Sequence, residues 1–294
     1  MKAHQAEFPI RRMCQVLGVS TSGYYTWVNR PPSARAIRNQ ALTDQIRQIH
    51  ESSRGTYGAP RVYEELLDRG IHIGYHRVAR LMRLAGLQGV SRRRSVRTTC
   101  QDRQATPATD LVERDFSAQA PNQLWIADIT YIPTLAGFVY LAVVLDVFSR
   151  RVVGWATAAN MKAELVVAAL DMAISQRKVD RVIHHSDKGS QYTSLLFGNR
   201  CKTAGIQLSM GSTGDCYDNA MCESFFATLE CELIDRTTFK NRWQAEMEIF
   251  QFIEGWYNPH RRHSSIDYLS PINYERKHVN QTKNPNQKLS TKTG

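Results

Sequence analysis

The sequence lacks the long apolar runs and the paired cysteines that several protein classes require. The longest apolar stretch, residues 138–147, is interrupted by Asp146 and falls short of the roughly 18 to 20 residues that a membrane-spanning helix needs. The N-terminal residues have no apolar core typical of a signal peptide, so we expect a cytoplasmic protein with no membrane partner. No two of the six cysteines have the two-residue spacing of a zinc knuckle. Cys216, Cys222 and Cys231 lie near one another without a nearby histidine, and we expect reduced thiols.

Lysine is almost absent from the first part of the chain, although that part is strongly basic. The 294 residues carry a formal charge of +11. Residues 1–120 contain 19 Lys and Arg against 10 Asp and Glu, a net of +9, and Lys2 is their only lysine; the remainder has 19 against 17, a net of +2. Arginine pairs with phosphate through a planar fork, so this segment indicates a polyanionic partner. A merely solvated basic surface would have the same composition.

A helix-turn-helix pattern opens the basic segment. Apolar residues at 10–17 lead into Gly18, and Ser20 is a suitable cap for a second helix that the prolines at 31–32 end. An ordinary helical hairpin would show the same pattern, so both alternatives stay open at this point.

A second unit of this kind follows, and it carries a stripe of arginines. One helix is expected to begin at Pro60 and end at Gly70, and another to end at Gly86. Three arginines at three-residue spacing on this last helix can meet a DNA backbone or groove: Arg77, Arg80 and Arg83. Two such units predict DNA binding. The linker that follows has four more arginines that we expect to lie on phosphates: Arg92, Arg93, Arg94 and Arg97.

The pattern of the chain changes near residue 120. Three β-type runs, at 123–133, 138–149 and 151–159, precede an alternation of helix, strand, helix, strand and helix that reaches residue 235. This order predicts an α/β ribonuclease H-like core, a five-stranded mixed sheet with flanking helices, preceded by a small all-α helix-turn-helix region. A further helix should follow, and a frayed polar tail after Tyr274. The expected domains are a DNA-binding region at 1–90, a basic linker at 91–118, a catalytic core at 119–275 and a tail at 276–294.

Three acidic residues of this second part are candidates for chemistry. Asp128 lies inside an apolar strand, where its charge needs a cation or strong hydrogen bonds. Asp187 ends a strand, and Glu223 lies one turn into a helix that Asn219 can cap. The expected buried face of that helix leaves Glu223 at its margin and consists of Cys222, Phe226, Leu229 and Leu233. Each acid alone has an ordinary structural explanation, but together they offer the oxygen ligands that magnesium prefers.

Four motifs, in this order, resemble the catalytic half of insertion-sequence transposases of the IS-three family, which are relatives of retroviral integrases. They read WIADITY, HSDKGSQYTS, YDNAMCESFFATLE and WYNPHRRHSSIDYLSP. The family signature has two aspartates and then a glutamate after 35 further residues, and the 35 positions 188–222 between Asp187 and Glu223 match it. The resemblance is to the second-reading-frame type and extends back to about residue 8. Lys188 stands where arginine is frequent, so we expect it to contact DNA without a bidentate fork.

The resemblance implies that Asp128, Asp187 and Glu223 form a catalytic triad that binds Mg²⁺ or Mn²⁺, as two ions, and that the enzyme cleaves and joins DNA during transposition. It also implies a homo-oligomer assembled on the element ends and the target DNA, and hence an association with the nucleoid. The protein of an upstream reading frame, fused or associated, would supply another helix-turn-helix and a coiled coil.

Other polar residues are expected to have structural roles. We expect Asp146 to pair with Arg150 or Arg151 rather than to bind metal. Four histidines are interpreted as packed, structural or phosphate-contacting rather than as metal ligands: His184, His185, His260 and His263.

Two other functions remain open at this point. A nuclease of the same fold would cut DNA without joining it. A DNA-binding regulator with an inactive core is disfavoured because all three acids are present.

Overall fold

The computed structural model describes residues 1–91, 112, 116–211 and 220–283. The chain divides into two compact units, Met1–Gln88 and Gly89–Gly294. Within the described ranges, no helix combines the length and the apolar character needed to cross a membrane.

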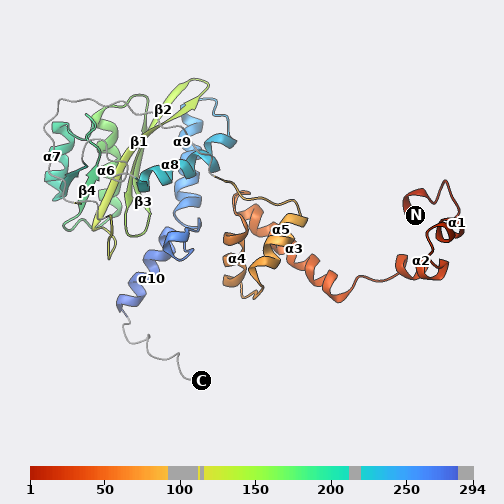
Figure 1. Cartoon of the computed structure of the whole chain (residues 1–294). Helices are drawn as coiled ribbons and strands as arrows, with labels where there is room; N and C mark the ends of the chain where they lie inside the picture. Colours follow the sequence, from red (N-terminus) through yellow and green to blue (C-terminus); the bar gives the residue numbers. More distant parts are fainter. Residues whose placement is uncertain (92–111, 113–115, 212–219, 284–294) are drawn as a thin grey trace. The chain divides into compact units, whose positions relative to one another are not determined.

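The first unit is helical, and its first helix-turn-helix pattern forms as expected. Its helices are η1 (Lys2–His4), α1 (Ile10–Val16), α2 (Thr21–Val28), α3 (Ala34–Ser52), α4 (Ala59–Asp68) and α5 (Tyr75–Leu84) (Figure 1). Gly18 has φ +65° in the turn after α1, a conformation that favours glycine. Ser20 then caps α2 by accepting a hydrogen bond from the Gly23 N–H. Val16 and Leu17, which the pattern predicts to face inward, are exposed.

Helices α3, α4 and α5 share one small apolar interior. Its fully or nearly fully buried side chains are Ile46, Ile49, Val62, Leu66, Val78, Leu81 and Met82. Gly70 and Gly86 follow α4 and α5 with positive φ, so the predicted helix ends are confirmed. Helix α3 was not expected from the sequence, because its apolar residues are spread thinly among polar and charged ones.

The second unit is built on a five-stranded mixed sheet, which confirms the predicted fold class. Its strands are β1 (Leu124–Thr134), β2 (Gly137–Asp146), β3 (Val152–Ala158), β4 (Ile183–Ser186) and β5 (Gln207–Met210). They lie in the order β3-β2-β1-β4-β5. The first three form an antiparallel meander, and β4 and β5 extend the sheet from β1 in parallel register. A central strand, β1, therefore joins the antiparallel and parallel parts.

Helices flank this sheet (Figure 1). The elements outside the sheet are α6 (Ala163–Gln176), α7 (Leu195–Ala204), α8 (Ala220–Glu232), η2 (Ile234–Arg236), α9 (Arg242–Phe252), a π-helical turn η3 (Ile253–Tyr257), η4 (Ser264–Ile266) and α10 (Pro271–Lys283). The main core lies between the sheet, α6 and α7. Gly154 of β3 lets α6 approach the sheet backbone closely. Helix α8 packs against β1, and α9 against β1 and β2.

Two expectations for the C-terminal part are wrong. Phe225, rather than the predicted Phe226, belongs to the buried face of α8, together with Cys222, Leu229 and Leu233. The frayed tail expected after Tyr274 is wrong for residues 275–283, which continue α10. Glu275 is buried and forms ion pairs with Arg151, which directly precedes β3, and with Arg177 at the end of α6, so α10 is held to the sheet.

Candidate active site

The two candidate aspartates lie on neighbouring parallel strands. In the register of β1 and β4, Ala127 is opposite Ser186, so Asp128 and Asp187 each come one residue later at the same edge of the sheet. Asp128 is half-buried, and its Oδ1 accepts a hydrogen bond of 2.7 Å from the Ile129 N–H. Asp187 is exposed where the chain leaves β4. Its Oδ1 accepts from the Gly189 N–H at 3.1 Å, so the loop itself orients the carboxylate.

Glu223 comes from a third element, the first turn of α8. Its side chain is exposed beside the buried face of the helix, as predicted. The proposed cap of this helix, Asn219, lies outside the described residues. Helix α8 packs against β1, the strand that carries Asp128.

The charges of these acids act on two buried side chains. Burial raises the pKa of the Cys222 thiol well above its usual value, and the charges of Asp128, Asp187 and Glu223 raise it further. Burial also raises the pKa of the Tyr192 hydroxyl, again with contributions from Asp128 and Asp187. All three carboxylates are therefore within electrostatic reach of one thiol.

The donor chemistry of this cluster suits a hard divalent cation. Carboxylate oxygens are the protein ligands that Mg²⁺ and Mn²⁺ prefer. Among the residues that the structure describes, no three His, Cys, Asp or Glu side chains lie closely enough together to hold a metal ion. Two of the three acids, Asp187 and Glu223, are exposed at the rim, which leaves their oxygens accessible.

The side chains of β4 that precede Asp187 are packed, as the sequence predicts. His184 is completely buried against Tyr192 and Phe197, and burial lowers its pKa to about 4. The His185 Nδ1 lies 2.9 Å from the Ser209 Oγ of the adjacent strand. The next residue after Asp187, Lys188, is half-buried.

Asp146 has a structural role, but the predicted partner is wrong. Its carboxylate accepts hydrogen bonds from the Asn122 N–H at 2.6 Å and from the N–H and hydroxyl of Ser149. Arg150 and Arg151 meet Asp146 through the main chain, and the Arg151 guanidinium pairs with Glu275 instead. Burial raises the pKa of Asp146, in part offset by these N–H donors.

The segment that follows α9 is also structural. Arg261 forms a buried ion pair with Glu232 at the end of α8. His263 packs on the Tyr257 ring, whereas His260 is exposed beside Trp256, so the two histidines do not converge on one point.

One residue near the triad was not anticipated. Arg150 donates a hydrogen bond to the hydroxyl of Ser224, the residue after Glu223, and its charge acts on Cys222. The sequence signal was ambiguous, because an arginine four residues after Asp146 fits an ion pair equally well.

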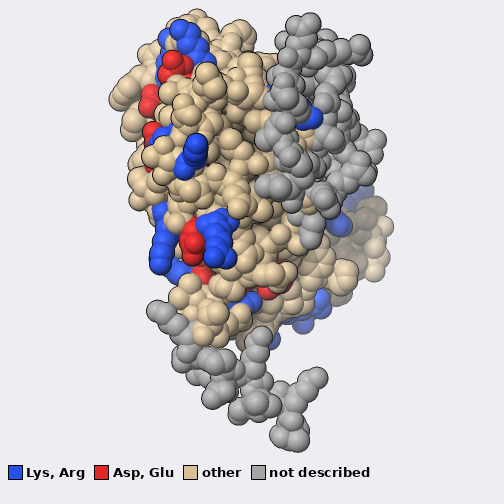
Figure 2. Space-filling model, turned by 90° about the vertical axis from the view of Figure 1, so that its left-hand side faces the viewer, with Lys and Arg blue, Asp and Glu red and all other residues tan. Residues whose placement is uncertain are grey.

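The candidate DNA contacts lie in different surroundings. Arg80 and Arg83 are exposed on α5, whereas Arg77 is half-buried and donates from Nε and Nη2 to Asn39 Oδ1 of α3, at 3.2 and 2.7 Å. The four linker arginines, Arg92, Arg93, Arg94 and Arg97, lie outside the described residues. On the face drawn in Figure 2, Lys and Arg side chains stand apart from one another and are interspersed with Asp and Glu.

Family models match most of the chain and define its class. An HTH-like domain matches residues 38–95, and the integrase core domain matches residues 118–216 and 204–271. The chain thus combines a helix-turn-helix region with an integrase-type catalytic core.

Curated relatives identify the family within this class. The transposase for insertion sequence element IS629 of Shigella sonnei is 39% identical over 275 residues, covering 92% of each chain. The transposase InsF for insertion sequence IS3A of Escherichia coli K12 is 39% identical over 282 residues, covering 95% of this chain and 98% of that one. The chain belongs to the IS-three family of insertion-sequence transposases.

Solved structures that match the chain include the HTLV-2 integrase catalytic core domain in complex with magnesium, in its trimeric form. That chain is 16% identical, with a TM-score of 0.43, over 54% of this chain and 99% of its own length. A simian T-cell lymphotropic virus intasome in complex with a PP2A regulatory subunit matches over 78% of this chain and 74% of its own, with 13% identity and a TM-score of 0.46.

Proposed function

We propose that this transposase cleaves and joins the DNA strands of its insertion sequence at a divalent-metal site formed by Asp128, Asp187 and Glu223. The observation that carries the proposal is the parallel register of β1 and β4, in which Asp128 and Asp187 directly follow a matched pair of residues, together with the packing of α8, which carries Glu223, against β1. The membership of the family supports the polynucleotidyl transfer itself.

The three carboxylates would hold Mg²⁺ or Mn²⁺, as a pair of ions. Bound there, such ions supply activation of the attacking oxygen and stabilisation of the leaving oxygen. The strand aspartates are fixed by backbone hydrogen bonds to Ile129 and Gly189, so their own oxygens need little reorganisation.

The reaction would have two in-line displacements at one site. In the first, the oxygen of water bonds to phosphorus at the element end, the bond from phosphorus to the 3′ oxygen breaks, and that oxygen leaves as a 3′-hydroxyl. In the second, this hydroxyl bonds to a target phosphorus and displaces another 3′ oxygen. The matched motif positions carry acids rather than a nucleophilic side chain, so no covalent link between protein and DNA forms.

The basic first part would hold the DNA. Arg80 and Arg83 on α5 are exposed for phosphate contacts, and we extend this role to Arg77, Lys188 and the arginines at 92–94 and 97. This assigns DNA binding to residues 1–90, a basic linker to 91–118 and catalysis to 119–275, with α10 extending the catalytic core to Lys283. We further propose that the protein assembles as a homo-oligomer on the two ends of its element. The protein of an upstream reading frame, fused or associated, would add another helix-turn-helix and a coiled coil to this assembly.

A joining assay tests the proposal against its two alternatives. The full chain is incubated with labelled DNA that carries the ends of its own element, with Mg²⁺ or with a chelator. We expect joined products that require Mg²⁺. Cleaved ends without joined products would indicate a nuclease, and bound but uncut DNA would indicate a regulator.

A further inference from the structure

Arg150 lies in the tight connection between β2 and β3, in a backbone conformation that is unusual for arginine. Its φ is +63°, in the left-handed region that favours glycine. Its N–H donates to the Asp146 carbonyl at 2.8 Å, which closes the turn. A bulky residue keeps such a conformation only where the surroundings determine it.

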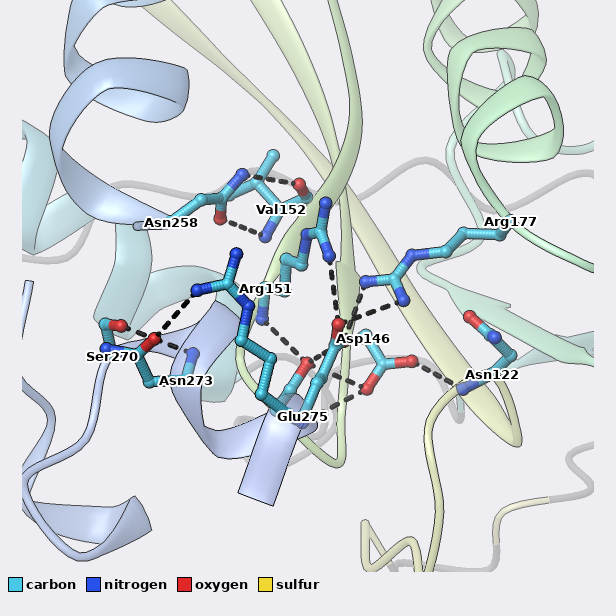
Figure 3. A network of polar contacts seen from close by, with 11 residues as sticks. Asn122, Asp146, Arg151, Val152, Arg177, Asn258, Ser270, Asn273 and Glu275 are labelled. Carbon is cyan, nitrogen blue, oxygen red and sulfur yellow. Dashed lines mark hydrogen bonds and ion pairs between the residues drawn. The ribbon is translucent and has the colours of Figure 1, made fainter. Parts of the chain in front are cut away.

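A buried polar cluster determines the conformation of this turn. Ser149, the preceding residue, is completely buried, and its hydroxyl lies 3.2 Å from Asp146 Oδ1 and 2.8 Å from Glu275 Oε1. Glu275 comes from α10 and lies between Arg151 and Arg177, with Asp146 beside it (Figure 3). Burial disfavours its charged form, but hydrogen bonds and charge from Arg177 outweigh this effect and lower the pKa of Glu275. Through Glu275, α10 thus contacts the residues on both sides of Arg150 and holds this turn in place.

From this turn, the Arg150 side chain extends to the first turn of α8. Nη2 donates to Ser224 Oγ at 2.9 Å, and Nη1 donates to Ser265 Oγ, in η4, at 3.3 Å. A planar guanidinium that bridges two hydroxyls from separate elements restricts rotation of both. Ser224 directly follows Glu223, so the bridge fixes the peptide that carries the third acid of the triad.

We propose that Arg150 is a positioning residue that holds the first turn of α8, and with it Glu223, in register with the two strand aspartates. This inference rests on the proposed metal site. The other end of α8 is tied independently by the Glu232–Arg261 pair. Loss of Arg150 should therefore loosen the first turn and leave the rest of the helix in place.

Manganese binding to the full chain, without DNA, tests this role directly. Hydrated Mn²⁺ gives an electron paramagnetic resonance signal that disappears on binding, so a titration yields the Kd. We expect Arg150→Met to raise the Kd by about 10-fold or more, as loss of groups that orient metal ligands does. Arg150→Lys keeps the charge without the fork and should be intermediate. At saturating Mn²⁺, with DNA varied, kcat of Arg150→Met should fall while its KM for DNA stays unchanged.

Two further variants serve as a control and as a safeguard. Arg236→Met removes an exposed arginine of η2 and should leave the Kd within about two-fold. Ser224→Ala removes only the hydroxyl on α8 that accepts from Arg150 and should raise the Kd for Mn²⁺ by about three-fold or more. This variant tests the positioning role if Arg150→Met does not fold.

The outcomes separate this inference from the proposed function. An unchanged Kd in folded Arg150→Met, or in Ser224→Ala if Arg150→Met is unfolded, overturns the positioning role while the metal site stands. If the wild-type chain takes up no Mn²⁺, the proposed metal site fails, and the role of Arg150 fails with it.

Discussion

Arg261 and Glu232 form an ion pair inside the second unit, which contains the integrase core, and both side chains are almost completely buried. The Nη2 of Arg261 donates to Glu232 Oε1 at 2.6 Å, and its Nε donates to Oε2 at 2.9 Å. The pair joins the end of α8 to the segment after α9. Each charge would be uncompensated in a buried place if the other were removed.

The first prediction concerns the stability that depends on this pair. Arg261→Met should lower the free energy of unfolding by about 3 to 5 kcal/mol, because Glu232 is left buried without its counter-charge. Urea unfolding followed by circular dichroism measures the loss. The double variant Glu232→Met with Arg261→Met should be more stable than Arg261→Met. A double variant as unstable as the single one would contradict this explanation.

The second prediction concerns the close approach of β3 and α6. A Cβ added to Gly154 would lie 2.1 Å from the Ala169 carbonyl oxygen and 2.8 Å from the Ala173 nitrogen, both backbone atoms. Gly154→Ala should therefore destabilise by about 1 to 3 kcal/mol or more through overpacking. Gly198→Ala in α7 is the matched control, since no atom lies within 4 Å of its added Cβ. Thermal unfolding should show a lower Tm for the first variant and an equal or higher Tm for the second.

The third prediction is a pH dependence that originates at His184. Burial lowers its folded pKa to about 4 from the usual 6.5, so between these values the unfolded chain binds a proton that the folded chain does not. This contribution to stability is present above pH 6.5 and is lost as pH falls toward 4. For His184→Gln, the loss of unfolding free energy between pH 7 and pH 5 should be smaller by about 2 kcal/mol. Urea titrations at both pH values measure it, and equal losses in both proteins would refute the assignment.

The fourth prediction isolates the proposed triad. Asp187→Asn should abolish both cleavage and joining, because it removes a metal-binding charge and no phosphate contact. DNA affinity should stay within about three-fold of wild type in a gel-shift titration. Near-normal cleavage by this variant would exclude Asp187 from the triad.

The fifth prediction distinguishes the arginines of α5. Arg80→Ala with Arg83→Ala should weaken DNA binding and reduce the slope of log affinity against log salt by about 0.9 for each phosphate that the protein no longer neutralises. Arg77→Ala should lower thermal stability as well, by about 1 to 2 kcal/mol, because its guanidinium bonds Asn39. An unchanged slope in the double variant would show that α5 does not face DNA.

The sequence predicted most elements of the catalytic unit because their apolar periodicity is strong. The runs that became β1, β2 and β3 are nearly continuous apolar stretches, and such stretches have few alternatives. Helix α3 was missed because its apolar residues are spread thinly among polar and charged ones and form no clear periodic face. The sequence predicted Phe226 instead of Phe225 as the buried side chain, because both fit an amphipathic pattern. Only the packing of α8 distinguishes them.

The polar contacts could not be predicted for a different reason. Arg151 and Glu275 are 124 residues apart in the chain, and nothing local to either residue identifies the other. The same holds for Arg150 and Ser224, which are 74 residues apart. Motif spacing identified the three candidate acids, whereas the residues that support them depend on the folded arrangement.

The parallel pairing of β1 and β4 has a consequence for how this site can vary. Hydrogen-bonded strands lie about 4.8 Å apart whatever side chains they carry, so the separation of the Ala127 and Ser186 backbones, which directly precede Asp128 and Asp187, is a property of the peptide group. Mutation of side chains in either strand has almost no means of altering it. The position of Glu223, by contrast, depends on side chains such as Arg150 and Arg261, each of which a single nucleotide change can replace. Mutations that alter the geometry of this site should therefore act mainly by shifting α8, and with it Glu223.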